Sequence, residues 1–70
     1  MLRLRVKEVA QEKGYSMMRL SRASDVSFNT IKRLYRNPYG GANINTLDKI
    51  ARVLGVSIAE LTEDVQGEAD

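Results

Sequence analysis

The 70-residue sequence contains no cysteine and no histidine. Without cysteine there can be no disulfide framework, and without either residue type the ligands of a zinc finger are missing. The lack of histidine also removes the usual general base of a nucleophilic triad. We therefore expect no enzymatic activity, no cofactor and no metal.

Long apolar runs are missing as well. The first nine residues, MLRLRVKEV, contain no stretch long enough for a signal peptide or a membrane span. We predict a cytoplasmic protein with no membrane partner, and no small-molecule ligand is evident. A chain of this length forms one small domain at most, which we place at residues 1–63, followed by an acidic, flexible tail at residues 64–70.

The charge of the chain is unevenly distributed. Residues 1–36 hold nine Lys and Arg against three acids, a net charge of +6, whereas residues 37–70 hold two against six, a net charge of −4. Such an asymmetry is what a surface that binds a polyanion requires. An ordinary solvated surface can show it too.

Two short helical patterns, residues 16–23 and 27–36, are separated by a turn too short for anything but a sharp corner. Ser16 and Ser27 stand where a side-chain oxygen can cap the first turn of each helix. Asp25, in the corner, is among the few residues besides glycine that tolerate the left-handed backbone conformation. The stretch therefore predicts two helices that cross at the corner.

The second of these helices has two different faces. An advance of about 100° per residue from Phe28 divides it into a polar and a largely apolar arc. The polar arc holds Asn29, Lys32, Arg33 and Arg36, and the other holds Thr30, Ile31, Leu34 and Tyr35. Phe28 lies at the boundary between the arcs.

The remaining segments predict three further helices and a loop. A helix from Val6 ends near Lys13, where Gly14 stops the pattern, and the segment NPYGGAN at residues 37–43 is a loop. A second helix is expected to open at Asn45, with Asp48 as its capping partner, and a last short one at the capping box of Ser57 and Glu60. Residues 2–6 fit a short strand or a frayed helix start, and a strand at 64–66 paired with residues 2–4 is one alternative.

These residues carry a family resemblance. Small Ser21, the turn residue Asp25 and apolar Leu20, Val26, Ile31 and Leu34 resemble, in order and spacing, the helix-turn-helix of the Cro/repressor-type DNA-binding domains, also called the xenobiotic-response-element family. The segment NINTLDKIARVLGVSIAEL is similar to that family's two following helices. The resemblance covers roughly residues 6–61. It departs at Met17, where glutamine is usual and touches a phosphate, and at Asp25, where glycine is usual.

The resemblance implies an all-α, compact five-helix, lambda-repressor-like fold whose second and third helices form the helix-turn-helix. It also implies a small transcriptional regulator that binds double-stranded DNA with helix 27–36 in the major groove. Of the two possible roles, repressor is preferred to activator. The predicted base-reading residues are Phe28, Asn29, Lys32 and Arg33. The predicted DNA-backbone contacts are Ser16, Met17, Arg19, Ser27, Thr30, Arg36, Asn37 and Asn43.

Chemistry gives some of these residues specific roles. The amide of Asn29 suits adenine, and the guanidinium of Arg33 suits guanine. Lys32 and Arg36 can reach either bases or phosphates. Phe28 fits two roles equally, packing against a thymine methyl group or filling the edge of the core.

Two points about partners stay open at this stage. A single module offers few base contacts, so a homodimer on a two-fold-related site is expected, through the Leu2–Val6 segment or the last helix. The alternative function is an antitoxin-like or adaptor module of the same fold, which would bind a protein through an apolar patch of Ile58, Leu61 and Val65.

Overall fold

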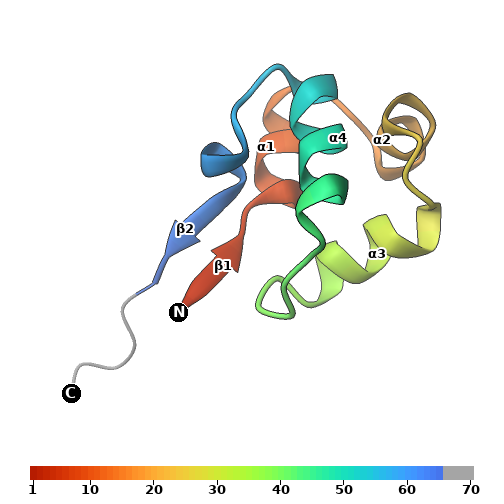
Figure 1. Cartoon of the computed structure of the whole chain (residues 1–70). Coiled ribbons are helices and arrows are strands. Elements are labelled where there is room, and N and C mark those ends of the chain that lie inside the picture. Colours follow the sequence, from red (N-terminus) through yellow and green to blue (C-terminus); the bar gives the residue numbers. More distant parts are fainter. Residues whose placement is uncertain (66–70) are drawn as a thin grey trace.

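A computed structural model describes residues 1–65 of the chain. The elements in chain order are β1 (Leu2–Leu4), α1 (Val6–Glu12), α2 (Met17–Ser24), α3 (Phe28–Arg36), α4 (Ile44–Leu54), the 3₁₀ helix η1 (Ile58–Leu61) and β2 (Thr62–Asp64). Figure 1 shows α1 and α4 side by side in the middle of the molecule, with α2 and α3 on one side and the two strands on the other. No helix among residues 1–65 is long and apolar enough to cross a membrane.

The domain is mostly helical as predicted, but the all-α class and the count of five helices were wrong. Residues 1–65 form four α-helices, one 3₁₀ turn and a two-stranded antiparallel sheet. Residues 2–4 are a strand, and their partner is the segment 62–64, not 64–66. The expected flexible tail falls mostly on residues 66–70, outside the described residues, whereas Asp64 belongs to β2.

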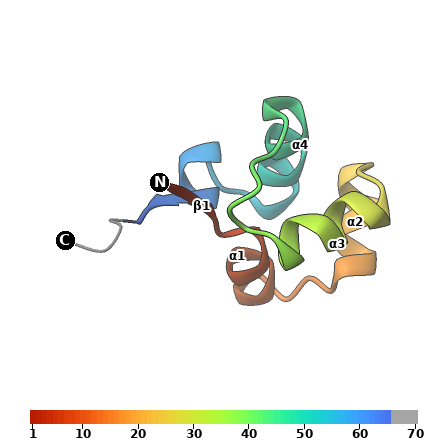
Figure 2. The ribbon, with the colours of Figure 1, turned by 90° about the horizontal axis from the view of Figure 1, so that it is seen from below.

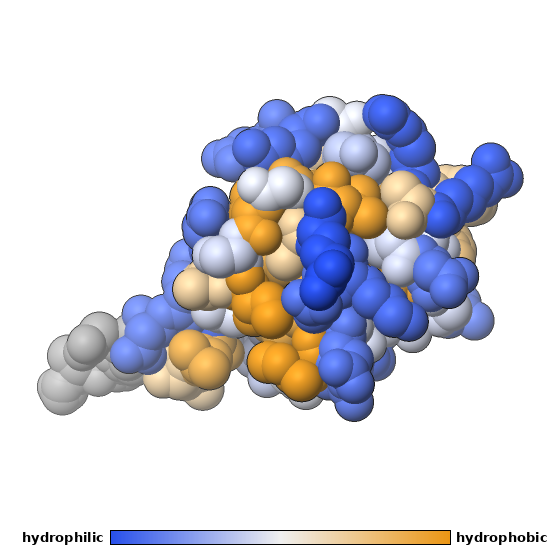
Figure 3. All heavy atoms as spheres, turned by 45° about the horizontal axis from the view of Figure 1, so that its top comes forward, coloured by the Kyte–Doolittle hydropathy of each residue, from blue (hydrophilic) through white to orange (hydrophobic). Residues whose placement is uncertain are grey.

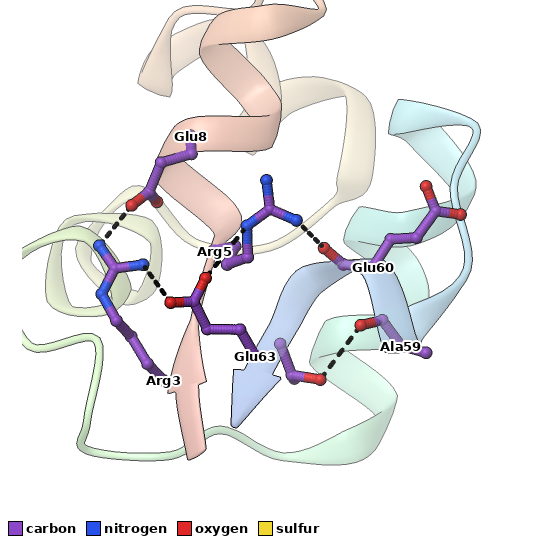
Figure 4. Close-up of polar contacts among 7 residues, drawn as sticks. Arg3, Arg5, Glu8, Ala59, Glu60 and Glu63 are labelled. Atoms are coloured by element: carbon purple, nitrogen blue, oxygen red, sulfur yellow. Dashed lines mark hydrogen bonds and ion pairs between the residues drawn. The ribbon is translucent and has the colours of Figure 1, made fainter. Parts of the chain in front are cut away.

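The register of the two strands brings oppositely charged side chains together. Arg3 lies opposite Glu63, so that unlike charges face each other across the ladder. Figure 4 shows how Arg3 also reaches Glu8 of α1, while Arg5 contacts the Glu63 carboxylate and the Glu60 carbonyl oxygen. The two paired strands, residues 2–4 and 62–64, are called the hairpin below, although they are distant in sequence. Through these contacts the hairpin ties both ends of the described chain to α1 and η1.

Burial and charge act against each other on Glu8. Partial burial alone would raise its pKa, but the hydrogen bond from Arg3 and the positive charges of Arg3 and Arg5 outweigh burial and hold the pKa of Glu8 below its ordinary value. The same contact with Glu8 raises the pKa of Arg3. Glu8 is therefore ionised in the folded protein near neutral pH.

A single apolar core lies between the helices and the hairpin. Its largest fully buried side chains come from five elements, namely Val6, Leu20, Ile31, Leu34, Ile50 and Leu61. Burying a Leu, Ile or Val side chain contributes roughly 1.5–3 kcal/mol, so this small set supplies a large part of the stability of the domain. Leu4 of β1 joins the same cluster, which fixes the hairpin against the helices.

The helix ends follow the sequence signals with one correction. The hydroxyl oxygens of Ser16, Ser27 and Ser57 accept hydrogen bonds from the backbone N–H groups three residues later, and Glu60 completes the capping box. The cap of α4 is Asn43, whose side chain accepts from the Asn45 N–H, and not Asn45 as predicted. Asn43 precedes Ile44 in extended conformation and can therefore cap a helix that starts two residues earlier than expected.

Candidate nucleic-acid interface

The corner between α2 and α3 is built by three short-range features. Asp25 adopts the left-handed conformation at φ 61°, and Val26 is buried with 7% of its surface exposed. The hydroxyl of Ser21 donates to the Val26 carbonyl oxygen at 2.6 Å, which ties the corner back to α2. The left-handed conformation predicted for Asp25 is confirmed, and the corner directs α3 across α2, as the view in Figure 2 shows.

The two arcs of α3 lie as the periodicity predicted. Ile31 and Leu34 are buried, and Tyr35 packs against the core with its hydroxyl buried. Burial raises the pKa of the Tyr35 phenol. Asn29, Arg33 and Arg36 are exposed on the opposite face. The structure thus leaves an amide and two guanidinium groups of one helix in contact with solvent.

The cations of α3 have no carboxylate partner within residues 1–65. The Lys32 ammonium lies 5.6 Å from the centre of the Phe28 ring, and Nη1 of Arg33 donates to the Gly41 carbonyl oxygen at 3.3 Å. Neither contact neutralises a charge. The face is therefore electrostatically suited to attract phosphates or the acceptor atoms of bases.

The first turn of α2 places three predicted backbone residues together. Ser16 caps the helix by accepting from the Arg19 N–H at 3.2 Å, while Met17 is half-buried against the core. The Arg19 guanidinium lies 4.7 Å from the centre of the Tyr15 ring and donates to the Gly14 carbonyl oxygen. Sequence reasoning missed this contact of Tyr15, because Tyr15 precedes the cap of α2 and no helical spacing links it to Arg19.

Ser27 and Thr30, both predicted to contact the DNA backbone, are hydrogen-bonded to each other at the start of α3. The Ser27 hydroxyl accepts from the Thr30 N–H and donates to the Thr30 hydroxyl oxygen at 2.8 Å. The Thr30 hydroxyl proton remains available to an acceptor such as a phosphate oxygen. This end of α3 is therefore both capped and able to donate.

The loop between α3 and α4 is held at several points. The Gly40 N–H donates to the Asn37 carbonyl oxygen, and the Leu4 N–H of β1 donates to the Pro38 carbonyl oxygen at 2.8 Å. Gly41 has φ 77°, a conformation that favours glycine. Asn37 and Asn43 are both exposed, at the two ends of this fixed loop. The side-chain oxygen of Asn43 is used as a cap, so its amide NH₂ is the group left for an outside acceptor.

The apolar patch of the alternative function is not formed as predicted. Leu61 has no exposed surface, because it points into the core, and Ile58 and Val65 are half-buried. Figure 3 shows apolar side chains on one face of the molecule among charged ones. The most exposed large apolar residues are instead Met1, Leu2 and Ile44. A partner could not bind Leu61 without opening the core.

Two helices joined by a short turn are the arrangement of a helix-turn-helix. The exposed cations on the second helix fit its role in the major groove. The chain belongs to the Cro/C1-type HTH DNA-binding domain family, whose model matches residues 5–67. The family resemblance inferred from the sequence is confirmed.

Two curated relatives give the same picture. The chain is 31% identical over 64 residues to the HTH-type transcriptional regulator SinR of Bacillus subtilis (strain 168), and 31% identical over 64 residues to SinR of Bacillus licheniformis. Each match covers 91% of this chain and 58% of the relative. The chain thus spans less than two thirds of the length of these regulators.

Proposed function

We propose that this chain is a sequence-specific double-stranded DNA-binding module of a transcriptional regulator, and that the regulator is a repressor. The observation that carries the proposal is the exposed face of α3, whose cations have no carboxylate partner in the described part of the chain. A helix that presents such a face behind a helix-turn corner fits the major groove with its first turns toward the base edges. The relatives are named as transcriptional regulators, which supports the regulatory role.

Within this proposal the residues of α3 divide between bases and backbone. Asn29 offers a donor and an acceptor that match adenine, and Arg33 offers a fork that matches guanine O6 and N7. Phe28 and Lys32 complete the base-reading set. Arg36, one turn beyond Lys32, is assigned to a phosphate, together with Ser27 and Thr30 at the other end of the helix.

Phosphate contacts on either side of α3 would fix its depth and orientation in the groove. On one side we assign Ser16, Met17 and Arg19, through the first-turn N–H groups of α2 and the Arg19 guanidinium. On the other side we assign the exposed amides of Asn37 and Asn43, because the loop that carries them is already fixed by Leu4 and Arg33. A fixed loop loses little entropy when it docks.

The proposal includes two copies of the domain on a two-fold-related site. One module presents four candidate base-reading residues, and useful affinity at physiological salt requires more contacts than a single half-site gives. Leu2 is the exposed apolar residue of the predicted Leu2–Val6 dimer segment, since Leu4 and Val6 are buried. The matched region is only 58% of the SinR relative, so the relative has further residues that this chain does not match. Dimerisation is therefore proposed and not taken over from the relative.

The test is selection of bound sequences from a random duplex pool, followed by measurement of stoichiometry on the selected duplex. A palindromic consensus bound by two chains would support the proposal in full. A consensus without symmetry, bound by one chain, would keep the DNA-binding function and remove the dimer. Recovery of no consensus would remove sequence-specific binding.

The alternative of an adaptor module is separated by the same protein sample. It predicts that substitution of Arg33 leaves the complex with a protein partner intact, whereas substitution of the exposed apolar residue Ile44 disrupts it. The DNA-binding proposal predicts loss of duplex binding on substitution of Arg33.

A further inference from the structure

The ring of Phe28 is not part of the core. Phe28 is the first residue of α3 and is half-buried, yet it is absent from both the buried cluster and the partly buried side chains that pack against that cluster. Met17, Tyr35 and five other half-buried apolar residues do pack there. Of the two roles that the sequence allowed for Phe28, filling the edge of the core is therefore not the one the structure favours.

Lys32 covers the Phe28 ring instead. The two residues are one helical turn apart, and the Lys32 ammonium lies 5.6 Å from the ring centre, within the range of a cation–π contact. Lys32 is half-buried despite its charge and forms no ion pair within residues 1–65. The contact holds an apolar ring and an ammonium group next to each other at the end of the helix that enters the groove.

We propose that Phe28 and Lys32 act as one specificity-determining unit, which reads a thymine methyl group and an adjacent guanine. The inference rests on the proposed DNA-binding function and names part of what it recognises. An aromatic side chain suits the C5-methyl of thymine, and a lysine suits the O6 and N7 acceptors of guanine. Because the Lys32 ammonium lies 5.6 Å from the ring centre and successive base pairs are about 3.4 Å apart, the two groups are close enough to address neighbouring base pairs.

The experiment uses the selected duplex with each thymine replaced in turn by deoxyuridine, which removes only the methyl group. For the unsubstituted protein we expect one thymine in each half-site whose replacement weakens binding about fourfold, the effect of withdrawing one buried methyl group. A cytosine at that position should bind more tightly when it carries a 5-methyl group. In F28A the Kd should no longer depend on either methyl group.

Two further variants test the pairing of the side chains. F28L keeps an apolar contact but has no ring face, so it should retain part of the methyl effect. K32A should relax the preference for the neighbouring guanine, and the costs of F28A and K32A should not add in the double variant, because each removes the same contact. Urea midpoints of all variants establish that they are folded.

The possible failures are distinct. If the unsubstituted protein selects no DNA sequence, the proposed function itself fails. If it selects a sequence but deoxyuridine has the same effect in the unsubstituted protein and in F28A, or if the costs of F28A and K32A add, the reading unit is overturned while DNA binding stands.

Discussion

The arginines of the hairpin and the cations of α3 have opposite surroundings. Arg3 and Arg5 lie beside Glu8 and Glu63, and their charges are matched within the fold. Lys32 and Arg33 form no ion pair among the described residues, where the Lys32 ammonium lies near a ring and the Arg33 guanidinium donates to a carbonyl oxygen. The same residue types therefore serve folding on one side of the molecule and remain available for a partner on the other.

This difference shows why charge alone does not locate an interface. The amino-terminal half of the chain carries a net charge of +6, but two of its arginines, Arg3 and Arg5, form ion pairs with Glu63 of the acidic half. Exposed ion pairs contribute about 0–1 kcal/mol each, so the pairs in the hairpin matter less for stability than for removing positive charge from that side. Among residues 1–65, the cations of this half that have no acidic partner lie mainly on α2 and α3.

The largest expected effect is the dependence of DNA affinity on salt. Each neutralised phosphate should add about 0.9 to the slope of log affinity against log salt. Arg36→Ala should lower that slope by about one unit. Arg52→Ala is the matched control, because Arg52 is already paired with Asp48. Arg52 is in the last turn of α4, and Figure 1 shows this end of α4 away from α3. A slope near zero in the unsubstituted protein, or equal loss in both variants, would contradict an interface on α3.

The second expected effect is on base recognition. Arg33→Ala should cost about 1–3 kcal/mol of binding free energy on the selected duplex and relax the preference at one base pair. Binding to the selected and to a scrambled duplex, compared by titration, gives both quantities. Equal weakening on both duplexes would mean that Arg33 contributes charge and holds the loop at Gly41 without reading a base.

The third prediction concerns the element that leads into the hairpin. Ser57→Ala should lower the free energy of unfolding by about 1 kcal/mol, because the cap of η1 and its capping box with Glu60 are lost. Urea denaturation measures the change. Ala59→Ser, an exposed change within the same 3₁₀ turn that leaves the cap intact, is the control. An unchanged midpoint in Ser57→Ala would show that burial of Leu61 alone fixes the turn.

The smallest expected effect is on the pH dependence of stability. The pKa of Glu8 is lowered in the folded protein, so the unfolded chain binds more protons and the stabilisation is complete above about pH 4.5, the ordinary pKa of glutamate. It is lost as the pH falls through the lower, folded pKa. Glu8→Gln should therefore destabilise by at most about 1 kcal/mol near neutral pH, and the difference from the unsubstituted protein should vanish in acid.

The control for this effect is Glu12→Gln on the same helix, since Glu12 forms no ion pair in the described part of the chain. Thermal unfolding at a series of pH values measures both variants. If they behave alike at every pH, the Arg3–Glu8 contact does not stabilise the hairpin.

Much of the fold could be predicted because its signals are local. The caps at Ser16, Ser27 and Ser57, the left-handed Asp25 and the buried face of α3 all depend on residues within one or two turns of each other. The alternative function placed Leu61 in a partner-binding patch, and this part of it is wrong for a different reason, since Leu61 is fully buried. Whether an apolar residue on a short turn faces solvent or core depends on packing against α4, which no local pattern specifies.

The candidate site and the sheet likewise combine features set by local sequence with features set by contacts between distant residues. The exposure of Asn29, Arg33 and Arg36 follows from helical periodicity, and the sequence by itself determined it. The pairing of residues 2–4 with residues 62–64 joins segments almost at opposite ends of the described chain, so only the tertiary structure decided that they form strands. It also decided that Arg3 and Arg5 meet Glu63, and that Phe28 lies under Lys32 and outside the core. The physical reason is that strand pairing and burial depend on contacts between residues distant in sequence, whereas capping and helical faces do not.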